Sequence, residues 1–78
     1  MKLKLSEMKV GEQGKVVGYG PGKKQYLDRI FSMGLTVGTE FEIVRIAPLG
    51  DPVEINVRGF NLSLRKQEAD ILLVQRRD

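Results

Sequence analysis

The stretch Ala47–Val74, APLGDPVEINVRGFNLSLRKQEADILLV, decides the fold that we predict for this chain. It opens with a turn over residues 48–52, because two prolines fix φ there, a glycine tolerates positive φ, and Asp51 can fold its carboxylate back onto its own backbone. Alternating apolar residues follow over 53–57 and again over 60–64, which is the period of half-buried strands. Because only two residues, an arginine and a glycine, separate these strands, the pair is predicted to be a β-hairpin.

Working outward from this hairpin, we expect three further elements on its two sides. Residues 65–70 are polar and tolerate a helical turn, and the apolar run 71–74 is a strand that can close the sheet. On the amino-terminal side, residues 40–47 are apolar on both faces near their centre, which favours a strand in the middle of a curled sheet.

The amino-terminal half predicts one helix, one strand and one short turn. Residues 23–33 form the helix, ended by Gly34, with its apolar face in the core. Residues 12–19 form a glycine-rich strand. A single helical turn near the start is capped by Ser6 and covers one end of the sheet. The side-chain assignments are these: Val17 and Tyr19 share one face of the strand and Val16 the other, Leu3, Leu5 and Met8 lie on the turn, and Tyr26, Leu27 and Phe31 are core residues.

This order of elements predicts a mainly β protein with one α-helix, namely a small five- to six-stranded SH3-like barrel. We expect residues 1–78 to form a single domain, with the helix in one inter-strand connection. A chain of this length buries only roughly 60–65% of the surface that its unfolded form exposes, so we expect no deep cleft.

The composition excludes several classes of site. The chain has neither histidine nor cysteine, so it has no disulfide framework, no soft-metal site and no common nucleophile–base pair. We therefore expect no enzymatic activity, no cofactor and no tight Fe²⁺ site. Glycines 18, 20 and 22 suggest a phosphate loop, but the Lys-Ser/Thr ending that holds phosphate and magnesium is missing. No apolar run approaches the ~20 residues of a membrane span, and no secretory signal is present, so we expect a cytoplasmic protein without direct membrane insertion.

The basic character of the chain is concentrated at one end. The net charge is +3 and the pI about 9.5, and residues 1–24 contribute six lysines against two glutamates. Elsewhere basic and acidic residues alternate, as on a solvated surface. With only five aromatic residues, most of them expected inside the fold, we expect no nucleic-acid partner, although a small basic nucleic-acid-binding barrel stays open as an alternative.

Three segments carry a family resemblance. LSEMKVGEQGKV near the start, MGLTVGTEFEIV in the middle and above all APLGDPVEINVRGFNLSLRKQEA resemble the FeoA family of small cytosolic proteins of bacterial ferrous iron uptake. The resemblance covers nearly the whole chain. One departure is Val37, which stands where many members carry proline.

The resemblance implies a regulatory adaptor that docks on the cytosolic part of the FeoB-type membrane GTPase-transporter. Similar domains form the carboxy-terminal module of metal-dependent repressors, so a peptide-binding module is the other alternative. The resemblance also allows weak homo-oligomers. The turn is the best candidate contact, because its prolines reduce the loop entropy lost on binding. Helix-start lysines and an exposed arginine complete the predicted partner-binding residues, which are Lys23, Lys24, Pro48, Leu49, Gly50, Asp51, Pro52 and Arg58.

Overall fold

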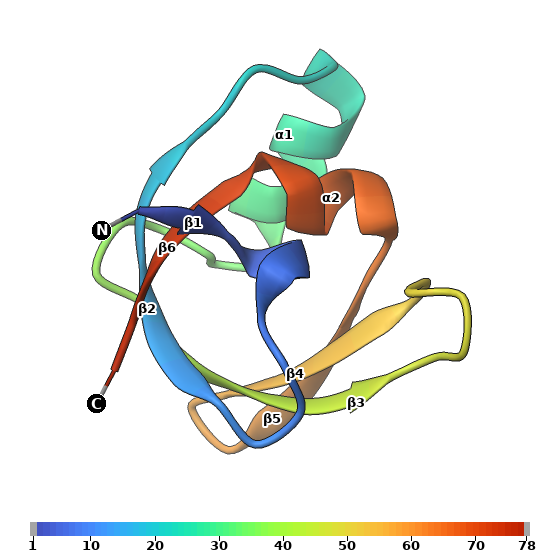
Figure 1. Cartoon of the computed structure of the whole chain (residues 1–78). Helices are drawn as coiled ribbons and strands as arrows, with labels where there is room; N and C mark the ends of the chain where they lie inside the picture. The colour runs from blue at the N-terminus through green and yellow to red at the C-terminus, as the bar shows by residue number, and fades with distance from the viewer. Residues whose placement is uncertain (1, 78) are drawn as a thin grey trace.

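The structure, a computed structural model, describes residues 2–77 (Figure 1). It has two α-helices, one 3₁₀ turn and six strands in the described residues. The predicted mainly β architecture is confirmed, with the strand number at the upper end of the expected range. In chain order the elements are β1 (Leu3–Lys4), η1 (Leu5–Glu7), β2 (Gln13–Tyr19), α1 (Lys24–Ser32), β3 (Glu40–Ile46), β4 (Val53–Val57), β5 (Phe60–Leu64), α2 (Lys66–Ile71) and β6 (Leu72–Arg76).

The strands form one curled antiparallel sheet in the order β1-β6-β2-β3-β4-β5 (Figure 1). Strands β1 and β5 are its two edges, and α2 lies between them, packing against η1, β1, β5 and β6. Helix α1 occupies the connection between β2 and β3 and packs on α2. The core lies inside the curl, and its buried apolar residues are Leu5, Met8, Val16, Ile30, Leu35, Phe41, Ile43, Val53, Ile55, Val57, Leu64, Ala69, Ile71, Leu72 and Val74.

The predicted hairpin is present as β4 and β5. Val57 lies opposite Phe60, so the loop has only two residues, Arg58 and Gly59, both with positive φ. Such a turn matches the right-handed twist of its strands. Val53, Ile55 and Val57 all point into the core, as the alternation predicts.

Strand β2 differs from its predicted facing because it contains a bulge. Val16 lies opposite Val74 but Gly18 lies opposite Leu73, so one extra residue is inserted at Val17. Beyond this bulge the inward parity changes, and Tyr19 joins Val16 on the inner side. The prediction that Val17 and Tyr19 share a face opposite Val16 is therefore wrong.

A second bulge explains why β3 is apolar on both faces. The register with β4 shifts between Ile43 and Arg45, so Ile43 faces inward before the bulge and Ile46 packs against the core after it. The two-faced pattern thus records a change of parity within one strand rather than burial of both sides.

Helix α1 has nearly the predicted bounds, but its apolar face is narrower than expected. Ile30 is fully buried, and Tyr26 and Leu27 are half-buried. Phe31, predicted to be core, is 50% exposed and stacks edge-on against Tyr19 with ring centroids 5.1 Å apart. The other aromatic side chains divide: Phe41 is buried and Tyr19 and Tyr26 pack half-buried against the core, as expected, whereas Phe60 is exposed like Phe31.

The amino-terminal segment covers one end of the core through Leu5 and Met8, as predicted. Its turn begins after a short strand, and the hydroxyl of Ser6 does not cap it. That hydroxyl instead donates to Asp70 Oδ1 of α2 over 2.6 Å. None of the helices in residues 2–77 is long and apolar enough to cross a membrane.

Candidate docking surface

The predicted turn joins β3 to β4 and is closed by its own backbone. Ala47 donates its N–H to the carbonyl of Pro52 over 3.1 Å, and Gly50 donates to the carbonyl of Ala47 over 2.8 Å. Gly50 has φ +80°, which a residue with a side chain would adopt only with strain. The five residues 48–52 therefore hold a defined shape before any partner arrives.

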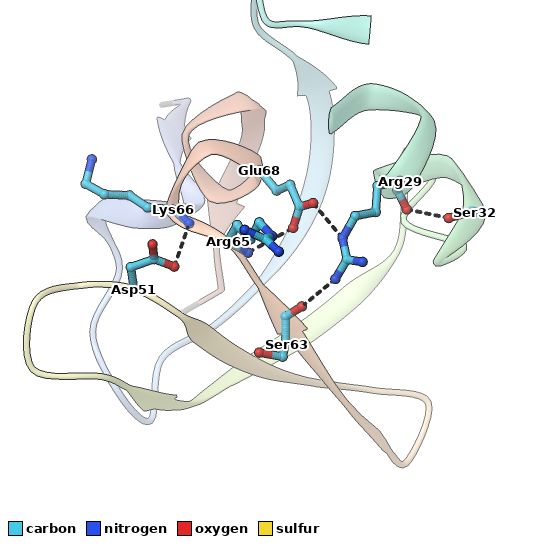
Figure 2. A network of polar contacts seen from close by, with 7 residues as sticks. All are labelled: Arg29, Ser32, Asp51, Ser63, Arg65, Lys66 and Glu68. Atoms are coloured by element: carbon cyan, nitrogen blue, oxygen red, sulfur yellow. Dashed lines mark hydrogen bonds and ion pairs between the residues drawn. The ribbon is translucent and has the colours of Figure 1, made fainter. Parts of the chain in front are cut away.

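Asp51 fastens this turn to α2 rather than to its own backbone. Its Oδ1 accepts a hydrogen bond from the backbone N–H of Lys66, the first residue of α2, over 3.2 Å (Figure 2). Leu49, two residues before Asp51, is 91% exposed. The turn thus presents one exposed aliphatic side chain, and its backbone is held by its own hydrogen bonds and by the bond from Lys66 to Asp51.

A cleft of about 370 Å³ lies at the other end of α2. Gly22 and Ile71 both line it, and they approach so closely that a Cβ on Gly22 would overlap the isoleucine side chain. Lys23 also lines the cleft, and the backbone N–H of Gly20 donates to the carbonyl of Ile71 over 2.7 Å, which holds the loop in place. The complete lining is Pro21, Gly22, Lys23, Tyr26, Gln67, Asp70 and Ile71.

The exposed side of α2 connects the turn to the cleft. Lys66 adjoins Asp51, and its ammonium lies 3.1 Å from the carboxylate of Asp70, one helical turn further on. We call the turn Pro48–Pro52, the α2 residues Lys66, Gln67 and Asp70, and Lys23 the docking ridge. Its α2 residues were missed from the sequence; the Lys66/Asp70 spacing of four was the available signal.

Two predicted residues lie outside the ridge. Lys24 points to solvent from α1 and pairs with Asp28 at 2.8 Å, which raises the pKa of this lysine. Arg58 lies in the β4–β5 turn, at the opposite end of β4 from the 48–52 turn. The structure therefore brings Lys23 and the predicted turn to the two ends of one helix and separates Arg58 from both.

Asp70 is the ridge residue with a defined electrostatic environment. The hydrogen bond from Ser6 is the main cause that lowers its pKa, assisted by the ammonium of Lys66 and opposed by partial burial. The carboxylate is therefore ionised at neutral pH. It places a negative charge in the cleft that Lys23 also lines.

Removing the Ser6 hydroxyl tests this environment. Ser6→Ala is expected to raise the pKa of Asp70 toward its ordinary value of 3.8. Because the folded-state pKa is depressed, ionised Asp70 stabilises the fold above the unfolded-state pKa, and that contribution is lost as the pH falls through the folded-state value. The stability difference between wild type and S6A should therefore be largest at neutral pH and should shrink as the pH falls below the ordinary aspartate pKa of 3.8. Carboxyl NMR titration and urea unfolding measure both effects, and identical Asp70 titrations would contradict them.

The ridge offers charged and apolar groups but no metal-ligand cluster. Residues 2–77 contain no group of three or more histidine, cysteine, aspartate or glutamate side chains placed to hold a metal ion. The surface offers three features: an exposed leucine, Leu49, on an ordered turn; the Lys66–Asp70 ion pair; and a shallow cleft beside them. These are features of recognition rather than of covalent chemistry.

Comparison with known proteins gives a consistent family. The model of the FeoA domain matches residues 3–76. The FeoA-like protein from Clostridium acetobutylicum, solved by NMR, superposes with a TM-score of 0.86 and 39% identity, covering 96% of this chain and 86% of that one. A manganese-dependent transcriptional repressor reaches a TM-score of 0.87 over 96% of this chain and 36% of its own, at 16% identity, which shows a shared fold alone.

One curated relative contains two transport proteins in a single polypeptide. It is the Fe(2+) transport protein A/Fe(2+) transporter FeoB fusion protein of Porphyromonas gingivalis, which is 36% identical over 67 residues. The match covers 86% of this chain but spans only 8% of the length of the fusion protein.

Proposed function

The chain belongs to the FeoA family, and from this premise we propose that it is an accessory protein of ferrous iron uptake that docks on the cytosolic GTPase part of a FeoB-type transporter. The observation that carries the proposal is the relative in which the two transport proteins form one polypeptide. Fusion gives two modules a high effective concentration, which favours a weak contact between them. The FeoA domain is a non-enzymatic accessory domain, so its effect passes through binding.

The docking ridge is the surface that we assign to this contact. Leu49 supplies the apolar anchor, and burial of an exposed leucine contributes about 2 kcal/mol to association. Because Asp51 and the backbone bonds already order the turn, little loop entropy is lost on binding. The charges of Lys23, Lys66 and Asp70 lie along the rim, where charges mainly steer and orient encounter.

Leu49→Ser is the sharpest test of this assignment. We expect roughly a 30-fold weaker affinity for the isolated GTPase part, the equivalent of about 2 kcal/mol, with an unchanged unfolding midpoint because the side chain contacts solvent. Calorimetric or NMR titration with and without GTP measures the affinity. Asp51 is a poor probe, since its replacement also removes the bond to α2.

Val37→Ser is the matched control for the Leu49 variant. Val37 is 62% exposed and lies in the α1–β3 loop. Backbone hydrogen bonds join this loop to Val16 in β2, which is not part of the docking ridge. It should bind like the wild type. Equal affinities of the wild type and the Leu49 variant would remove the turn from the interface, and no binding of the wild type to the GTPase part would overturn the proposed function itself.

A further inference from the structure

The turn between β4 and β5 holds an arginine in a backbone conformation that arginine disfavours. Arg58 has φ +53° and Gly59 has φ +83°, the combination of a two-residue turn in which asparagine or aspartate is the usual first residue. Residues other than glycine, asparagine and aspartate are strained in this left-handed region of positive φ. Such strain persists where another requirement outweighs it, and it is concentrated at functional positions.

The contacts of Arg58 within the chain do not account for its presence. Its side chain takes part in no hydrogen bond or ion pair among residues 2–77. Its Nη1 passes over Gly34, lying 3.5 Å from where a Cβ on that glycine would stand. Arg58 lines a surface hollow of about 190 Å³ together with Arg77, Glu40 and Glu42.

Phe60, next to this turn, is the second unexplained side chain. It lies opposite Val57, which is 3% exposed, yet Phe60 itself is 72% exposed on β5, an edge strand of the sheet. A chain of 78 residues has few large apolar groups to spare. In addition, β5 is an edge strand, FNLSL, without the charge or proline that usually protects an edge.

We propose that Arg58 and Phe60 form a second contact with the partner protein, in which Phe60 enters an apolar pocket and Arg58 pairs with a carboxylate on its rim. The inference rests on the proposed function, because the partner is the same cytosolic GTPase part. Arginine suits this role since its planar fork binds a carboxylate in a bidentate manner. The two arginines of the hollow are balanced by two glutamates, so it lacks the excess positive charge that binds a nucleic-acid backbone, and this favours a protein as the occupant.

The two contacts lie at opposite ends of β4. The docking-ridge turn precedes Val53 and the Arg58 turn follows Val57, so five strand residues, about 17 Å, separate them. The strand is central to the β3–β4–β5 part of the sheet, which fixes that separation. A partner that engages both ends is held in one orientation, which a single exposed leucine cannot achieve.

Two variants test the contact without damaging the fold. Arg58→Asn removes the cation but suits the left-handed backbone, so we expect the unfolding midpoint to stay or rise while the affinity for the isolated GTPase part falls about tenfold and becomes less salt-dependent. Phe60→Ser is expected to lower the affinity by a similar factor. Leu49→Ser and Val37→Ser are measured in parallel by calorimetry at two salt concentrations.

The outcomes separate this inference from the proposed function. If Leu49→Ser weakens binding but Arg58→Asn and Phe60→Ser do not, the second contact is wrong and the adaptor function stands. If the wild type does not bind the GTPase part, both are overturned. Self-association abolished by Phe60→Ser, or binding of single-stranded RNA lost in Arg58→Asn, would also overturn the inference by assigning the turn to another occupant.

Discussion

Replacing Arg29 by alanine is expected to lower the free energy of unfolding by about 3 kcal/mol, because it leaves a fully buried carboxylate without its counter-charge. That carboxylate belongs to Glu68 of α2, whose side chain is 0% exposed. Its Oε1 accepts the backbone N–H of Arg65 over 2.8 Å, and its Oε2 lies 2.7 Å from Arg29 Nε (Figure 2). Oε2 has no well-directed hydrogen bond within residues 2–77, so it depends on the charge of Arg29.

The same arginine also ties α1 to the edge of the sheet. Its Nη2 donates to the carbonyl of Ser63 in β5 over 3.5 Å, so one side chain joins α1, α2 and β5 (Figure 2). In a domain of this size, 1 kcal/mol shifts the melting temperature by about 4–8 °C, so the loss should exceed about 12 °C.

A double-mutant cycle isolates the pair. Glu68→Gln keeps an acceptor for the Arg65 N–H while removing the charge, so R29A/E68Q should be more stable than R29A alone. Lys24→Ala is the surface control on the same helix, because the Lys24–Asp28 pair is exposed, and its midpoint should equal that of the wild type. Urea unfolding gives all four values. Additive effects of R29A and E68Q would show that the two charges do not depend on one another.

The alternation of apolar residues and the turn residues predicted the β4–β5 hairpin and helix α1 correctly. The β4–β5 hairpin follows from its alternation and its two-residue turn, and α1 follows from its period and from Gly34. The wrong facing predicted for β2 and the two-faced apolar pattern of β3 have one cause, namely bulges at Val17 and Val44 that reverse the inward parity within a strand. A period-two reading has no means of placing an inserted residue.

The burial of Glu68 and the exposure of Phe60 reverse what residue type alone suggests. Both depend on the tertiary arrangement: Arg29 comes from α1, and Phe60 lies on β5, an edge strand of the sheet. The candidate surface shows the same limit. The prolines of the 48–52 turn are visible in the sequence, whereas its attachment to α2 through Asp51 requires the fold.

Gly14→Ala is expected to destabilise the protein by about 3 kcal/mol, although glycine-to-alanine changes in strands commonly stabilise when space allows. A Cβ on Gly14 would stand 2.7 Å from the carbonyl oxygen of Gln75, and 3.2 Å from Phe41 Cζ. The oxygen belongs to the backbone of β6, which is fixed by the β2–β6 ladder and cannot retreat without breaking it. Position 14 therefore requires glycine because there is no room for a Cβ atom between β2 and β6.

Gly18→Ala, in the same strand, is the matched control for this prediction. Its nearest neighbour would be Leu73 Cδ1 at 3.8 Å, an ordinary contact, so the change should be neutral or slightly stabilising. Chemical unfolding of the two variants compares the same substitution in the same strand at two separations from β6. Equal midpoints would mean that the sheet opens at Gly14 with little cost, and would contradict the tight approach of β2 and β6. A lower unfolding midpoint for Gly14→Ala alone would show that β2 and β6 approach more closely at Gly14 than at Gly18.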